Sequence, residues 1–110
     1  MSRRLSNLRS RAFTLQKGKC FYCGLPMWAG SPITFCSEYA VTVGQAAQFE
    51  CTAEHLEPKS GGGRDSTSNI VAACRHCNAT RHRRKEPLAP EKWQSIQHNR
   101  ADSRWPSNRR

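Results

Sequence analysis

The chain has few apolar residues and no long hydrophobic run. Only 36% of its 110 residues are hydrophobic, and its mean hydropathy is −0.78. No stretch of about 18 apolar residues is present, which excludes a membrane-spanning helix. The first 20 residues also lack an apolar stretch of signal-peptide length, so we expect a cytoplasmic protein rather than a secreted one. A short and polar chain predicts one domain with a small core that needs added cross-links.

Acidic residues are also scarce, and the resulting positive charge lies at the two ends. The chain has 8 Asp and Glu against 18 Lys and Arg, for a net charge of +10. Residues 1–19 carry +6, residues 20–74 carry −3 and residues 75–110 carry +7. Basic flanks suit contacts with phosphates, and central carboxylates suit a cation. The Arg- and Ser-rich start fits a nucleic-acid arm or an organelle transit peptide, and a generically basic protein stays an alternative.

Hydrophobic periodicity and turn residues predict a mixed α+β chain. A basic helix is expected over 3–16, stopped near Gly18, with an inner face of Leu5, Leu8, Ala12 and Leu15. Short strands are expected at 33–35, 39–43, 49–56 and 70–73, and the last two can pair with each other. A helix is expected from Cys74 to about Lys85. A final helix begins at Pro90, with Trp93, Ile96 and Gln97 facing inward, and a polar disordered tail follows Arg100.

Six cysteines in a chain without an export signal favour metal ligands over a disulfide framework. Four of them form two Cys-x2-Cys pairs, Cys20/Cys23 and Cys74/Cys77. Two such turns can complete a tetrahedron of thiolates around Zn²⁺ with no open position, which predicts a structural zinc. Redox dithiols are the alternative for these pairs. Cys36 and Cys51 have no assigned role; we expect Cys51 to be a small buried residue, and a disulfide between the two is not favoured.

A run of polar residues lies between the two cysteine pairs. Glu54-His55 is followed by Pro58-Lys-Ser-Gly-Gly-Gly63, then by Asn69 before an apolar segment, and then by Cys74-x2-Cys77-Asn78 and His82. In order and spacing this run resembles the HNH endonucleases, in the branch with two zinc-binding Cys-x2-Cys turns. The resemblance covers about 25 contiguous residues and the Cys20/Cys23 pair. It implies an α+β fold, a small zinc-stapled domain in which a ββα-metal (HNH) motif is flanked by helices.

The resemblance also implies a role for each polar residue of the run. His55 is the general base, and Asn69 orients it and braces the loop. Glu54, Asn78 and His82 are the expected ligands of a catalytic divalent ion, although His82 can equally contact phosphate. Adjacent strand residues point to opposite faces, so a bend at the end of the strand is needed to bring Glu54 and His55 to the same phosphate.

The expected organisation is therefore a basic N-terminal helix or arm at 1–19, an HNH nuclease core with structural zinc at 20–86, and a C-terminal helix with a basic tail at 87–110. The expected partner is double-stranded DNA, with RNA also open, no membrane, and an unknown oligomeric state. Phosphate contacts are expected at the end of the helix that begins at the second cysteine pair, from Arg81, Arg83, Arg84 and Lys85. Oxygen ligands favour Mg²⁺ or Mn²⁺ as the catalytic ion, whereas a ligand from His82 favours Ni²⁺ or Zn²⁺. The alternative function is a non-catalytic zinc-stapled module that binds nucleic acid.

Overall fold

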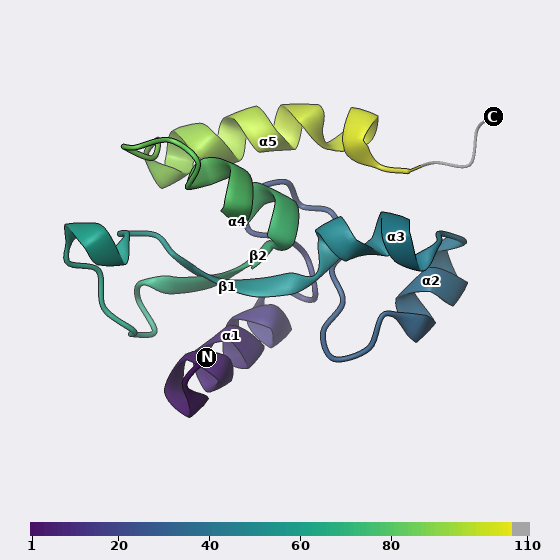
Figure 1. Cartoon of the computed structure of the whole chain (residues 1–110), viewed down its shortest axis with the longest axis horizontal. Helices are drawn as coiled ribbons and strands as arrows, with labels where there is room; N and C mark the ends of the chain where they lie inside the picture. The colour runs from purple at the N-terminus through teal and green to yellow at the C-terminus, as the bar shows by residue number, and fades with distance from the viewer. Residues whose placement is uncertain (107–110) are drawn as a thin grey trace.

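The computed structural model describes residues 1–106 and shows a small antiparallel hairpin surrounded by helices (Figure 1). The two strands are β1 (Cys51–His55) and β2 (Ile70–Cys74). The α-helices are α1 (Arg3–Leu15), α2 (Ile33–Tyr39), α3 (Val43–Ala46), α4 (Arg75–Arg81) and α5 (Pro90–Arg104), and short 3-10 turns lie at η1 (Ala47–Phe49) and η2 (Lys59–Gly61). This arrangement confirms the α+β class. None of these helices combines the length and the apolar character that crossing a membrane requires.

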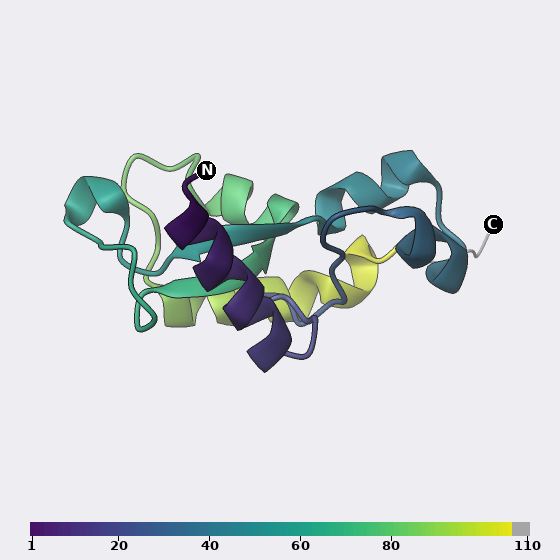
Figure 2. The same cartoon turned by 90° about the horizontal axis from the view of Figure 1, so that it is seen from below.

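The β1–β2 hairpin is the element on which the rest of the domain is assembled. Its register runs without interruption from Cys51↔Cys74 to His55↔Ile70. Helix α1 contacts both strands on one face, and α4 packs on the opposite face (Figures 1 and 2). Because side chains alternate along a strand, Thr52 and Glu54 share one face of β1. Both have hydrogen bonds with residues of α4 or its C-cap, so this is the α4 face.

Helix α1 confirms the predicted basic helix but changes its inner face. Ser2 caps the helix by accepting a hydrogen bond from the Leu5 amide, and Ala12 is buried against the hairpin. Leu15, the last residue of the helix, was expected to face inward, but it is 65% exposed. Phe13 packs against the core instead.

The segment 33–46 corrects the prediction of two strands. It forms α2 and α3 instead, because its β-branched residues favour strands in a prediction from sequence. Phe35 packs within 5.8 Å of Phe49, ring centroid to ring centroid, in a second small core that also contains Val41 and Ala46.

The two C-terminal helices differ from their predicted lengths. Helix α4 ends at Arg81 rather than near Lys85. Helix α5 continues to Arg104, where a disordered tail was expected from residue 101, because Ala101 is buried and Trp105 stacks at 5.1 Å from Phe49. The predicted inner face of α5 is confirmed for Trp93 and Gln97, which are buried. The end of the predicted tail, residues 107–110, lies outside the described residues.

Candidate metal centres and active site

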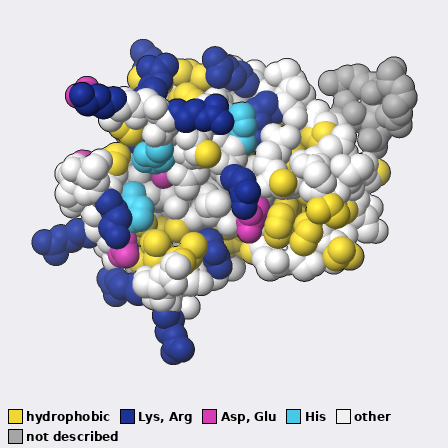
Figure 3. Space-filling view, viewed as in Figure 1, with side chains coloured by type: hydrophobic (Ala, Val, Ile, Leu, Met, Phe, Trp, Pro, Cys, Tyr) yellow, Lys and Arg dark blue, Asp and Glu magenta, His cyan; other side chains and the backbone are white. Residues whose placement is uncertain are grey.

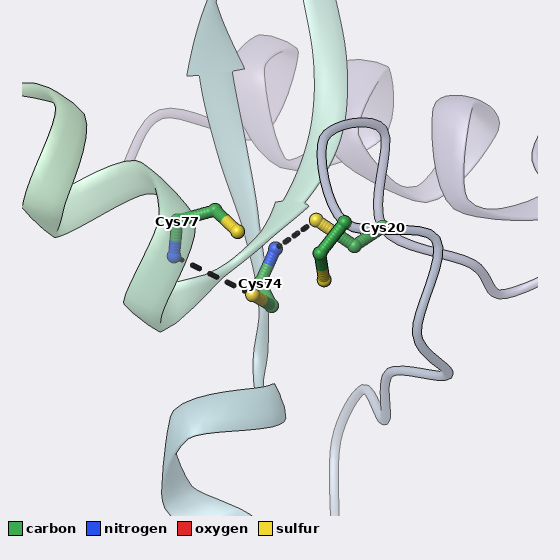
Figure 4. A group of neighbouring side chains, drawn as sticks. Cys20, Cys74 and Cys77 are labelled. Atoms are coloured by element: carbon green, nitrogen blue, oxygen red, sulfur yellow. Dashed lines mark hydrogen bonds between the residues drawn. The ribbon is translucent and has the colours of Figure 1, made fainter. Parts of the chain in front are cut away.

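The four predicted cysteines meet at one point beside the hairpin. All four Sγ atoms of Cys20, Cys23, Cys74 and Cys77 lie within 4.8 Å of one another, and all four residues are buried. Figure 4 shows Cys20, Cys74 and Cys77 at this point. A tetrahedral Zn²⁺ with Zn–S bonds of about 2.3 Å separates its sulfur ligands by about 3.8 Å. The cluster therefore fits zinc and can hold it as a structural ion that joins the N-terminal turn to the β2–α4 junction.

Hydrogen-bond donors surround these sulfur atoms, as thiolates require. The Cys74 amide lies 3.3 Å from Cys20 Sγ, and the Cys77 amide lies 3.4 Å from Cys74 Sγ (Figure 4). Helix α5 adds two side chains: Gln97 Nε2 at 3.3 Å from Cys77 Sγ, and the Arg104 guanidinium at 3.7 Å from both Cys74 and Cys77 Sγ. Four thiolates and one Zn²⁺ carry a net charge of −2, so the positive charge of Arg104 offsets part of it.

Glu54 is buried on the α4 face of β1, and both of its carboxylate oxygens have partners. Its side chain is 2% exposed. Oε2 accepts hydrogen bonds from the Tyr22 hydroxyl at 2.7 Å and from Arg81 Nη1 at 2.8 Å. Oε1 lies 2.9 Å from His82 Nε2. Desolvation and the negative charge of Glu54 raise the pKa of the Tyr22 phenol, which remains a neutral donor.

The contact between Glu54 and His82 is a hydrogen bond whose length also suits two ligands of one ion. Two donors at about 2.1 Å from an octahedral ion, at right angles to each other, are separated by about 3.0 Å. The observed separation of 2.9 Å between Glu54 Oε1 and His82 Nε2 matches that value. His82 is about one-third exposed, so the pair can be reached from solvent.

Asn78 lies on the same helix face as His82, one turn earlier, and contacts the same strand. Its amide nitrogen donates to Thr52 Oγ1 at 3.0 Å and to the Ala53 carbonyl at 3.1 Å. Both bonds use the nitrogen, which leaves the amide oxygen without a hydrogen bond to residues 1–106. Within those residues, the four cysteines are the only group of three or more His, Cys, Asp or Glu side chains close enough to hold an ion. An ion at Glu54 and His82 therefore needs amide or water oxygens for its remaining ligands.

His55 turns toward the loop between the strands and away from Glu54. Its Nε2 lies 2.7 Å from Asp65 Oδ1. The bend that the sequence required is absent from β1, because pairing continues through His55↔Ile70. The two side chains consequently have different partners. Asn69 braces this loop: its Oδ1 accepts from the Glu57 amide at 2.8 Å, and its Nδ2 donates to the Arg64 carbonyl at 3.0 Å.

The expected phosphate contacts at the end of α4 separate into two groups. Arg83, Arg84 and Lys85 are exposed. Arg81 is buried, with 2% of its side chain exposed. Its guanidinium forms an ion pair with Glu54 and donates hydrogen bonds to the carbonyl groups of Leu56 and Leu88. A phosphate cannot reach it in this arrangement, so the prediction of a surface contact at Arg81 does not fit its position.

The exposed basic residues and the histidines lie on one half of the molecule. Viewed as in Figure 1, basic and histidine side chains gather over the half that contains α4, whereas hydrophobic side chains gather over the half that contains α2 and α3 (Figure 3). A polyanion approaching this face meets positive charge next to the Glu54–His82 pair.

Three residues of these sites had not been singled out from the sequence. Tyr22 lies inside the first Cys-x2-Cys turn, Asp65 follows the glycine run, and Arg104 lies in the segment expected to be a tail. The position of Asp65, two residues after the glycines and ten after His55, offers the only hint of a contact with the histidine. Nothing in the spacing of Tyr22 or Arg104 signals their partners.

A comparison with family models finds a match to the HNH endonuclease family at residues 44–84. The matched segment contains β1, the loop with Asn69, β2 and α4. No curated protein and no solved structure matches the chain.

Proposed function

We propose that this chain, which matches the HNH endonuclease family at residues 44–84, is a metal-dependent endonuclease that hydrolyses phosphodiester bonds of DNA. The observation that supports this most strongly is the Glu54–His82 pair, separated by 2.9 Å and adjacent in sequence to His55. A carboxylate and an imidazole at that distance could both bind one ion, and His55, the next residue along β1 but on the other face of the strand, is the candidate base.

Each residue then has a chemical role. Glu54 and His82 would hold the divalent ion, with the amide oxygen of Asn78 as a further ligand. When bound, that ion supplies Lewis-acid stabilisation of the charge that develops on the phosphate. His55 takes a proton from the attacking water as the new P–O bond forms and the bond to the leaving oxygen breaks, and the leaving oxygen takes a proton from solvent. The mixed oxygen and nitrogen ligands favour Mn²⁺, Ni²⁺ or Zn²⁺ over Mg²⁺.

The cysteine cluster and the basic surface have supporting roles in this proposal. A structural Zn²⁺ at the cysteines fixes the start of α4 and thereby the position of His82. Arg83, Arg84 and Lys85 hold the DNA backbone, aided by the exposed Arg3, Arg4 and Arg11 of α1. Such contacts position the duplex without reading its sequence.

A plasmid cleavage assay tests the proposal. Zinc-loaded protein is incubated with supercoiled plasmid and Mg²⁺, Mn²⁺ or Ni²⁺, and a parallel sample contains EDTA. We expect nicking that needs the added ion. His55→Ala lowers the rate by about 10²–10⁴-fold, the usual contribution of a general base, without weakening DNA binding. His82→Ala raises the ion concentration needed for half-maximal rate. His98→Ala, at an exposed position on α5, is the matched control and cleaves at the wild-type rate.

Two results would contradict the proposal. Undiminished cleavage by His55→Ala removes the histidine as base. Tight DNA binding by the wild type, with no cleavage in any of the ions, supports instead a non-catalytic zinc-stapled binding module, in which the Arg81–Glu54 ion pair is purely structural. A parallel digest of single-stranded and double-stranded RNA shows whether DNA is the preferred substrate.

A further inference from the structure

Asp65 is the one side chain among residues 1–106 that the structure bonds to the ring of His55. The distance from His55 Nε2 to Asp65 Oδ1 is 2.7 Å, and the two side chains are 14% and 24% exposed. A contact this short between a ring nitrogen and a carboxylate is a charge-assisted hydrogen bond.

The loop that carries Asp65 is held in place from both ends. Asn69 ties its two sides together through hydrogen bonds to the backbone at Glu57 and Arg64. Gly63 packs so closely on the Glu57 carbonyl that any side chain there collides with it. From α1, Arg4 Nε donates to the Asp65 carbonyl at 2.9 Å. The position of Asp65 against His55 is therefore set by the fold rather than by one flexible side chain.

We propose that Asp65 is a positioning residue for His55: its carboxylate accepts the Nε2–H proton, fixes the ring, and selects the tautomer in which Nδ1 is the unprotonated nitrogen. The consequence for catalysis rests on the proposed nuclease function, since Nδ1 is then the atom that takes the proton from water. Nδ1 has no hydrogen bond to the described residues. The hydrogen bond that one ring nitrogen makes decides which of the two carries the proton.

The charge state of Asp65 agrees with this role. The hydrogen bond from His55, together with the positive charges of Lys59 and Arg4, holds the pKa of the Asp65 carboxyl below its usual value. Asp65 is therefore an ionised acceptor at neutral pH, and it cannot donate a proton to the ring.

The direct test is the tautomer of His55 in zinc-loaded protein, read by long-range ¹H–¹⁵N correlation NMR of the imidazole rings near pH 8 without added catalytic ion. We expect a protonated Nε2 and an unprotonated Nδ1 in the wild type. Asp65→Asn presents an amide that can donate to Nε2, so the proton moves to Nδ1 in a detectable fraction of molecules. Asp65→Glu keeps a carboxylate and restores the wild-type pattern. Glu57→Gln removes a charge from an exposed site of the same loop and changes nothing.

Cleavage measurements with the same variants extend the test to function. Asp65→Asn should cleave at least about tenfold more slowly than the wild type, but no more slowly than His55→Ala, with unchanged DNA binding and partial rescue in Asp65→Glu. A wild-type His55 protonated on Nδ1, or a tautomer that Asp65→Asn does not alter, would overturn the role of Asp65. Absence of cleavage by the wild type would instead refute the proposed function, while the NMR result still decides whether Asp65 orients the ring.

Discussion

The buried ion pair between Arg81 and Glu54 gives a prediction that separates a structural arginine from a nucleic-acid contact. The Arg81 guanidinium donates to Glu54 Oε2 at 2.8 Å, to the Leu56 carbonyl at 3.1 Å and to the Leu88 carbonyl at 2.9 Å. Both charged side chains are 2% exposed. Arg81→Met removes the cation and leaves the Glu54 carboxylate buried, with only the Tyr22 hydroxyl and His82 as partners.

Breaking a buried ion pair by removing one partner costs about 3–5 kcal/mol. Domains of this size have total stabilities of about 5–15 kcal/mol. A loss of that size lowers Tm by about 12–20 °C, since 1 kcal/mol corresponds to about 4 °C in a domain of about 100 residues. The prediction is therefore a large loss of stability in Arg81→Met. The matched control, Arg83→Met, replaces an exposed arginine two residues later and should change stability by less than about 0.5 kcal/mol.

The assay is urea denaturation of both variants at one fixed Zn²⁺ concentration, followed by circular dichroism, with DNA affinity measured in parallel. We expect Arg81→Met to lose stability and Arg83→Met to lose DNA affinity. A change below about 1 kcal/mol in Arg81→Met, accompanied by weaker DNA binding, would refute the structural assignment and return Arg81 to the phosphate contacts.

Two further predictions concern the cysteines. Arg104→Met removes the cation beside Cys74 and Cys77 Sγ and should release zinc to a chelator about 10–100-fold faster than the wild type. Arg100→Met, on the exposed side of α5, should release zinc at the wild-type rate. Equal release rates in the two variants would contradict the contact of Arg104 with the thiolates. Burial raises the pKa of the Cys51 thiol to about 11. In zinc-loaded protein at pH 8 a maleimide should therefore label Cys36 well before Cys51, and EDTA should make the four zinc ligands reactive as well. Rapid labelling of Cys51 in the folded, zinc-loaded state would show that it is not buried as described.

The parts of the fold that the sequence predicted well are those with a strong local pattern. The two Cys-x2-Cys turns point to one metal, and the apolar run at 70–73 lies between turn residues and the second cysteine pair. Helices α2 and α3 were missed because Ile33-Thr34-Phe35 and Tyr39–Val43 are rich in residues that favour strands. A local helix signal was present at Thr42 and Gln45, which form a capping box at the start of α3.

The partners of the site residues depend on contacts between distant segments, which spacing does not show. Arg81 follows the basic pattern of the residues after it, yet Glu54 on β1 and Leu88 beyond the helix bury it. Trp105 lies in a polar stretch, and only its packing on Phe35 and Phe49 extends α5 toward it. Asp65 reaches His55 only because the loop braced by Asn69 folds back onto the hairpin. The sequence therefore indicates which residue types the site contains, whereas the contacts between those residues follow only from the fold.

We propose that Glu54 and His82 hold a divalent ion. Anomalous diffraction from crystals of zinc-loaded protein soaked in Mn²⁺, recorded on both sides of the manganese absorption edge, tests it most directly. We expect a manganese peak within about 2.2 Å of Glu54 Oε1 and His82 Nε2. The same protein carrying His82→Ala should lack this peak and keep the zinc at the four cysteines. A map with no manganese near Glu54, or with Glu54 bonded only to Tyr22, Arg81 and His82 at saturating Mn²⁺, would contradict it.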